Sequence, residues 1–149
     1  MINDKMQVTG DVTLTLTDEK GNLKARQEIK NLVVNAGLTF INQRMLGTSQ
    51  AVMSHMAFGS GTNAAAAGDT TLQTQVGSRE LLDAAVNDSP GVITYTCTFE
   101  PGDATGALTE AGIFNAGTSG NMLCRTKFDV VNKSSTDTLA ITWVVTISV

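Results

Sequence analysis

The final stretch of the chain alternates between apolar and small or polar side chains, and this pattern constrains the fold more than any other sequence feature. It reads Leu139-Ala-Ile-Thr-Trp-Val-Val-Thr-Ile-Ser-Val149. Because successive side chains of a strand point to opposite faces, residues 139, 141, 143, 145 and 147 share one apolar face. The pattern predicts a strand with one face in the core and a threonine-rich face turned outward.

The same alternation recurs along most of the chain, with turn-forming residues between the runs. Gly21 and Asn22 can adopt the backbone of a tight turn, which predicts a hairpin between the first two runs. Short alternating runs at this spacing are typical of an antiparallel sandwich. We therefore predict a mainly β fold, an antiparallel β-sandwich of jelly-roll-like type. The expected strands cover residues 8–17, 23–34, 78–86, 92–100, 108–114, 122–131 and 138–149.

One segment has helical spacing instead. Leu38, Ile41 and Met45 recur every three to four residues, Asn35 is expected to cap the segment, and Gly47 is placed to end it. This predicts one short α-helix near residues 36–46.

An alanine-rich stretch follows between two glycines, within residues 59–70. Four alanines are too few to overcome the cost of helix nucleation, so a surface loop is expected there. Asp69 is expected to cap at most one short helical turn after it.

The chain of 149 residues has no internal repeat and no linker, which predicts a single domain over residues 1–149. Residues 1–7 precede the first alternating run and are expected to form an extended N-terminal arm. The net charge is −4 and the basic residues are scattered, so nucleic acid is not an expected direct partner. We also expect no membrane association, because no apolar run approaches about 18 residues and no secretion signal begins the chain.

Residue types that commonly carry chemistry are few. His55 is the only histidine, and a half-buried strand histidine is favoured over a catalytic base. Cys97 and Cys124 lie in alternating runs, where buried thiols are favoured over one disulfide. These three side chains do not supply a four-ligand metal site. We therefore predict no catalytic residues, no cofactor and no bound metal.

Glu110 places a carboxylate in an otherwise apolar run. It could be an acid with a raised pKa, or it could form a structural ion pair with Arg79 across the sheet; the ion pair is favoured because no nucleophile motif accompanies it. Gly59-Ser-Gly-Thr62 lacks the third glycine and the lysine of nucleotide-binding loops. Its glycines are expected to let a strand turn sharply into the loop.

Several short motifs occur in a defined order along residues 30–149. They are Lys30-Asn-Leu-Val-Val-Asn-Ala-Gly-Leu38, Met53-Ser-His-Met-Ala-Phe-Gly-Ser-Gly-Thr62, Gly68-Asp-Thr-Thr-Leu72, Arg79 and Leu108-Thr-Glu-Ala-Gly-Ile-Phe-Asn115. In this order the chain resembles a group of small tailed-phage virion proteins. It is more loosely similar to the N-terminal domain of phage tail-collar fibre proteins, but no shaft or receptor-binding tip follows, which disfavours an adhesin.

The resemblance implies a non-enzymatic virion protein, most simply a capsid decoration or cement protein that binds and bridges capsid subunits. The alternative is a tail, neck or fibre-attachment adaptor of the same virion. Expected partners are phage capsid or tail proteins and further copies of the chain, as a homo-oligomer and specifically a trimer. The protein would be made in the host cytoplasm. A carbohydrate-binding module is disfavoured, because Trp143 and Tyr95 lie inside expected strands and leave no exposed aromatic platform.

Overall fold

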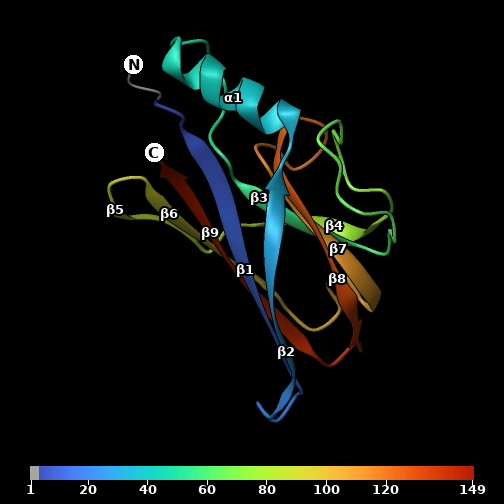
Figure 1. The fold of residues 1–149 in the computed structure, drawn as a ribbon. Helices are drawn as coiled ribbons and strands as arrows, with labels where there is room; N and C mark the ends of the chain where they lie inside the picture. Colours follow the sequence, from blue (N-terminus) through green and yellow to red (C-terminus); the bar gives the residue numbers. More distant parts are fainter. Residues whose placement is uncertain (1–3) are drawn as a thin grey trace.

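The computed structural model describes residues 4–149, which form nine strands and one helix (Figure 1). The strands make one antiparallel sheet in the order β4-β3-β7-β8-β2-β1-β9-β6-β5. The elements are β1 (Gln7–Thr17), β2 (Leu23–Val33), α1 (Asn35–Met45), β3 (His55–Gly59), β4 (Gln75–Leu81), β5 (Ala84–Ser89), β6 (Val92–Phe99), β7 (Gly106–Phe114), β8 (Met122–Lys133) and β9 (Thr138–Ser148). The prediction of a mainly β fold with one short helix is confirmed.

The expected hairpin is present, as β1 and β2 with Gly21 at a φ of 81° in the turn. Of the predicted N-terminal arm, residues 1–3 lie outside the described part of the chain. Residues 4–6 have no regular secondary structure, whereas Gln7 already pairs with Ser148 as part of β1.

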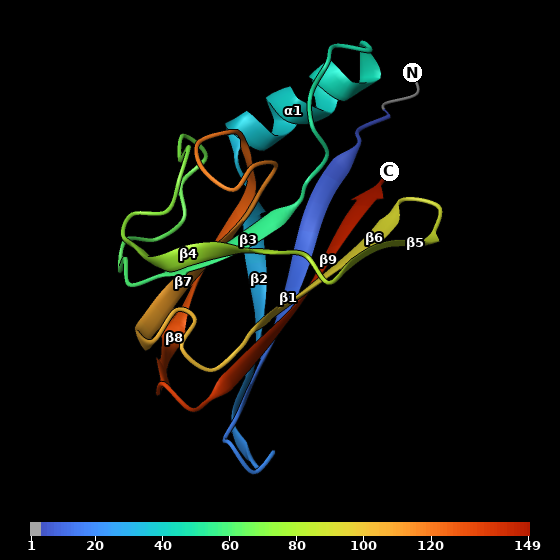
Figure 2. The same cartoon turned by 180° about the vertical axis from the view of Figure 1, so that it is seen from behind.

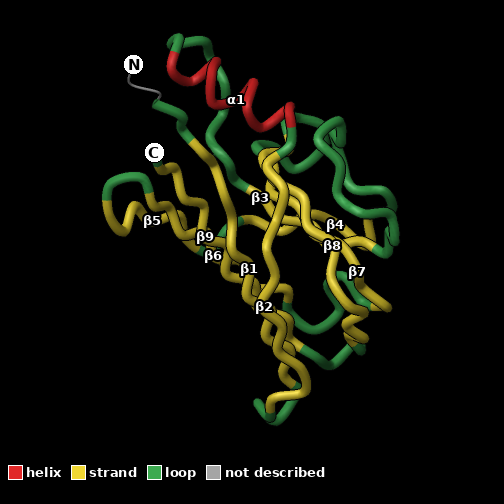
Figure 3. The backbone as a smooth tube through the Cα atoms, viewed as in Figure 1, coloured by secondary structure: helices red, strands yellow, loops and turns green. Residues whose placement is uncertain are grey.

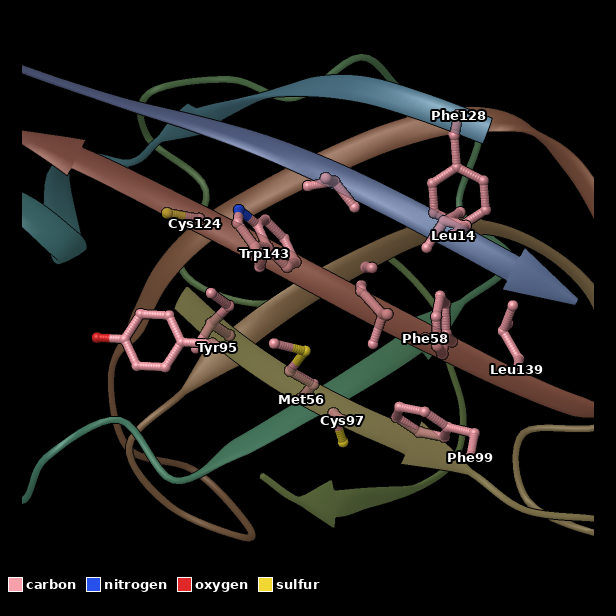
Figure 4. Packing of buried hydrophobic residues seen from close by; sticks show 14 of the residues in the cluster. Leu14, Met56, Phe58, Tyr95, Cys97, Phe99, Cys124, Phe128, Leu139 and Trp143 are labelled. Carbon is pink, nitrogen blue, oxygen red and sulfur yellow. The ribbon is translucent and has the colours of Figure 1, made fainter. Parts of the chain in front are cut away.

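The sheet curls so that its two halves face each other across a common core (Figures 1 and 2). One half contains β1, β9, β6 and β5, and the other contains β4, β3, β7 and β8. Between them, Phe58 packs edge-to-face against Phe99 with ring centroids 4.7 Å apart, and Trp143 is fully buried (Figure 4). Aromatic pairs in this geometry add to the stabilisation from apolar burial. The inward faces are those expected from the alternation, most clearly in β9.

The predicted strand 78–86 is wrong, because this segment forms two strands at opposite edges of the sheet. β4 pairs with β3, and β5 pairs with β6. The change of partner falls between two successive residues: the Leu82 N–H donates to the Ser54 carbonyl at 2.9 Å, and the Asp83 N–H donates to the Thr96 carbonyl at 2.7 Å. β4 and β5 are both extended, so the alternation of side chains in the sequence does not reveal the change of partner strand.

β3 is the strand implied by the expected strand histidine at position 55 and by the expected turn at Gly59, although no bounds were predicted for it. Its residues Met56, Ala57 and Phe58 are all buried, because the strand is covered on both faces. A strand buried on both sides has a short continuous apolar run in place of alternation, and such a run is a weaker strand signal.

β2 and β8 pair over only two positions, Leu32 with Arg125 and Val33 with Cys124. Beyond these positions the strands diverge (Figure 3). The cause is an irregularity in β8. Leu108 of β7 pairs with Val131, and Glu110 pairs with Lys127, so two steps along β7 correspond to four steps along β8. The extra residues form a bulge, and a bulge bends the strand that carries it.

The helix begins and ends close to the predicted positions, but its buried face is different. Val34 occupies the N-cap position without a side-chain hydrogen bond, and Asn35 is already helical. Gly47, at a φ of 73°, follows the helix as expected. The buried residues are Gly37 and Phe40, whereas Leu38 and Met45 are 43% and 75% exposed.

The reason for the different face is the close approach of the helix to β8. A Cβ atom at Gly37 would lie 2.2 Å from the backbone oxygen of Leu123, so only glycine allows this contact. The approach fixes the rotation of the helix, so that Leu38 and Met45 of the predicted stripe face outward while Ile41 packs against the core.

The two helix faces can be compared by alanine substitution. Phe40→Ala should lower the free energy of unfolding by about 3–5 kcal/mol, because a buried ring is replaced by a cavity. Met45→Ala should change it by less than about 0.5 kcal/mol, since the side chain is exposed. Urea denaturation followed by circular dichroism measures both values. A larger loss for Met45→Ala would contradict the observed orientation of the helix.

Candidate functional site

Glu110, on β7, is the centre of a buried polar network. Its side chain is fully buried and accepts three backbone hydrogen bonds from the long loop between β3 and β4. Oε1 accepts from the N–H groups of Gly61 at 3.0 Å and Thr74 at 2.7 Å, and Oε2 accepts from that of Gln73 at 3.0 Å. The carboxylate therefore fastens both ends of the loop to the sheet.

Arg125, on β8, is the charged partner of Glu110. Its Nε and Nη2 lie 3.0 and 2.8 Å from Oε2 of Glu110, Nη1 lies 3.0 Å from Oδ2 of Asp69, and Nη2 also donates to the Asn63 carbonyl at 3.0 Å. All three guanidinium nitrogens are thus engaged. A buried charge with this many partners is satisfied, whereas removal of one partner leaves an uncompensated ion.

The predicted ion pair between Glu110 and Arg79 is wrong, and the strand register explains why. Arg125 pairs with Gly112, which lies on the same face of β7 as Glu110, two residues away. The side chain at position 125 is therefore a diagonal neighbour of Glu110 on that face, within reach of its carboxylate.

Arg79, on β4, instead holds the loop that follows β7. Its guanidinium carbon lies 3.6 Å from the ring centroid of Phe114, and Nη1 donates to the carbonyls of Ala116 and Ser119 at 2.8 and 2.7 Å. Partial burial lowers the pKa of Arg79 from its ordinary value. Stacking on an aromatic face compensates a cation for part of its lost hydration.

The glycines of Gly59-Ser-Gly-Thr62 are required by the approach of the carboxylate. A Cβ atom at Gly59 would lie 2.5 Å from Oε1 of Glu110, and one at Gly61 would lie 2.6 Å from it. Neither glycine has a positive φ. The expectation that they permit a sharp turn is therefore replaced by a different reason: side chains here would displace Glu110.

The pKa of Glu110 reflects two opposed effects. Burial raises it, but the hydrogen bonds from Thr74, Gln73, Arg125 and Gly61 stabilise the charged form and leave the pKa below its ordinary value. The raised pKa that the sequence left open is therefore not found. Glu110 is a fixed anion that accepts hydrogen bonds.

Asp69 does not cap a helical turn, since the loop residues 60–74 contain no helix. Its Oδ2 accepts from the Ala66 N–H at 2.9 Å and contacts Arg125.

The role of Arg125 was not identified from the sequence. The residue lies beside Leu123 and Cys124, so it is a charged side chain in an apolar run, and the same kind of position singled out Glu110.

The remaining candidates lie apart from this network. His55 is half-buried on β3, as favoured, and its Nδ1 lies 2.7 Å from the Ser54 hydroxyl oxygen. Cys97 and Cys124 are free buried thiols, as favoured, and burial raises the pKa of each to about 12. Within residues 4–149, no three His, Cys, Asp or Glu side chains gather as a metal-ligand set.

A second electrostatic contact ties the β1–β2 hairpin to the start of β9. The Lys24 ammonium lies 2.6 Å from Oδ2 of Asp137, which also accepts from the Ser134 N–H at 2.8 Å. Hydrogen bonding by Lys24 is the main reason that the pKa of Asp137 falls to about 2. The group is thus more acidic in the folded protein than in the unfolded chain.

This pKa shift predicts a pH dependence with a defined sign. The contribution of Asp137 to stability should be fully present above about pH 4 and should be lost as the pH falls toward 2. In Lys24→Met, the loss of unfolding free energy between pH 4 and pH 2 should be smaller than in the unmodified protein. Urea titrations at these two pH values test this, and equal losses in both proteins would contradict it.

The surface around α1 carries a group of exposed apolar side chains, which we call the helix-end patch. Met6, Leu32 and Leu38 line an open groove of about 460 Å³ between the start of β1, the end of β2 and the helix. The patch comprises Met6, Leu32, Leu38, Met45, Leu46 and Val52. Exposed apolar groups gathered in this way are typical of protein contact surfaces.

No protein-family model, curated protein sequence or solved structure matches the chain. Within residues 4–149, no helix has the length and apolar character needed to cross a bilayer.

Proposed function

We propose that this protein is a non-enzymatic structural component of a tailed-phage virion, a decoration protein that binds and bridges capsid subunits. The order of motifs along residues 30–149 carries the proposal. Residues from those motifs belong to the network that fixes the long loop: Gly61 donates to Glu110, and Asp69 and Glu110 both bind Arg125. A buried, fully bonded network is suited to holding a rigid surface for contact.

The helix-end patch is the surface that we assign to this contact. Of its side chains, Leu46 is 81% exposed and Met45 75% exposed, so burial against a capsid subunit would remove apolar area from water. α1 contains one charged residue, Arg44, which donates to the Gln50 carbonyl at 2.8 Å. Docking at this end therefore requires little desolvation of charge.

The first test is the amount and position of the protein in purified particles. A decoration protein should be present in on the order of hundreds of copies, because it follows the symmetry of the shell. Quantitative mass spectrometry against the major capsid protein gives the number, and electron microscopy of tagged particles gives the position. A few copies at one vertex would favour a tail, neck or fibre-attachment adaptor, and absence from particles would contradict both.

Substitutions in the helix-end patch test whether this surface binds the capsid. Leu38→Asp with Met45→Asp should abolish binding to particles that lack the protein, while leaving the circular dichroism spectrum unchanged. Val130→Asp is the matched control, because Val130 is 53% exposed on β8 and lies outside the patch. Equal binding by both variants would remove the patch from the proposal. Light scattering of the free protein tests the expected trimer.

A further inference from the structure

The edge of β2 that faces β8 has main-chain groups without strand partners. The Lys30 carbonyl accepts from the Thr126 hydroxyl at 3.1 Å, so the main-chain groups of Lys30 point toward β8. In an antiparallel ladder, alternate residues direct their N–H and C=O groups to the same side. Those of Arg26 and Glu28 therefore point the same way, beyond the two positions at which β2 and β8 pair.

Two side chains reach from one strand to the other across this opening, which we call the β2–β8 gap. The Gln27 amide donates to the Asp129 carbonyl at 2.8 Å, in the bulged part of β8. This bond and the one from Thr126 each satisfy a single carbonyl. Among the described residues, the N–H groups of Arg26, Glu28 and Lys30 receive no partner from β8. The gap is thus an open strand edge next to a bulge.

An open groove of about 390 Å³ lies at the end of the gap next to the paired positions Leu32 and Arg125, and its charge indicates what it would accept. Lys30 and Lys127 line it together with Ala64, Ala65 and Thr126, and no carboxylate lines it. Lys30 contacts Asp11 from the β1 side, whereas Lys127 forms no ion pair within residues 4–149. The third cation, Arg125, is already engaged by Glu110 and Asp69.

We propose that the β2–β8 gap binds an extended acidic segment of a partner protein, which adds to β2 as a strand and places a carboxylate beside Lys127. Main-chain hydrogen bonds to Arg26, Glu28 and Lys30 would supply the affinity, and the charge beside Lys127 would supply the selectivity. The inference depends on the sheet alone and stands apart from the proposed role in a virion.

Amide hydrogen exchange measured by NMR tests the proposal with defined probes. Two synthetic ten-residue peptides, alternating valine or threonine with aspartate in one and with lysine in the other, are added to the full chain. The aspartate peptide should slow exchange at Arg26, Glu28 and Lys30 by about tenfold or more. The amides of Gln27 and Ile29 face β1 and should keep their rates.

Variants of Glu28 separate edge binding from other contacts. Glu28→Pro removes one unpartnered N–H on the edge and should abolish the protection. Glu28→Ala keeps the N–H and should retain it. Thermal unfolding of both variants establishes that they are folded. Lys127→Glu should weaken binding of the aspartate peptide at least about tenfold, because it reverses the nearest free charge.

Several results would overturn the proposal. They are no protection by the aspartate peptide, equal protection by the lysine peptide, or protection that is unchanged in Glu28→Pro. Protection that increases with protein concentration in the absence of peptide would identify a second copy as the occupant, and would also overturn it.

Discussion

Replacing Glu110 by glutamine should lower the free energy of unfolding by about 3–5 kcal/mol, the cost typical of breaking a buried ion pair from one side. The substitution keeps the size of the side chain but removes its charge. It leaves Arg125, which is 2% exposed, with Asp69 as its one remaining anion. The new amide group also places N–H donors against the N–H groups of the loop, which cannot accept them.

Chemical denaturation measures this loss, and amide exchange reports where it acts. Residues 60–74 should lose protection before the core strands do, because the carboxylate fastens this loop. Glu28→Gln is the matched control: Glu28 pairs with Arg26 at 2.8 Å on the surface, where ion pairs contribute less than about 1 kcal/mol. Similar losses in the two variants would mean that the buried pair contributes no more than the exposed one.

Replacing Trp143 by alanine should cost about 3–5 kcal/mol, since the largest fully buried side chain of the core would leave a cavity. The tryptophan also has a polar contact, because its Nε1–H donates to Oδ1 of Asn31 at 3.0 Å. Trp143→Phe keeps much of the packing and removes this donor. It should cost about 1–3 kcal/mol for the acceptor left buried and unpaired.

The two tryptophan variants are followed by far-ultraviolet circular dichroism, because both remove the only tryptophan of the chain. Val144→Ala is the control, on the outer face of the same strand, and should cost less than either variant. If Trp143→Phe were as stable as the unmodified protein, the bond to Asn31 would contribute nothing measurable.

Much of the sheet could be predicted from the sequence, because most strands have one face in the core. In β9, for example, the buried residues are Leu139, Ile141 and Trp143, and the residues between them are not buried. The alternation in the sequence therefore identifies the inward face of this strand. The same reasoning failed where a local pattern does not specify the partner. β4 and β5 are both extended, and the change of partner between them, at Leu82 and Asp83, depends on distant strands.

The candidate site was predictable in part for a similar reason. Glu110 stood out because a carboxylate in an apolar strand requires compensation. Its partner depended on register, since Arg125 lies opposite Gly112, two residues along β7 from Glu110. The buried face of α1 depended likewise on the contact of Gly37 with β8, which no helical periodicity reveals.

The pairing of β1 with β9 determines how the fold responds to mechanical load. The two strands are antiparallel, and Gln7 lies opposite Ser148, so the first and last strands meet at the same end of the sheet (Figure 2). A force that pulls Gln7 and Ser148 apart acts at one end of the ladder, so the hydrogen-bonded pairs would break one after another. A force that slides the two strands along each other would act on all the pairs at once. The pairing of β1 with β9 should therefore yield readily to tension applied between these two residues.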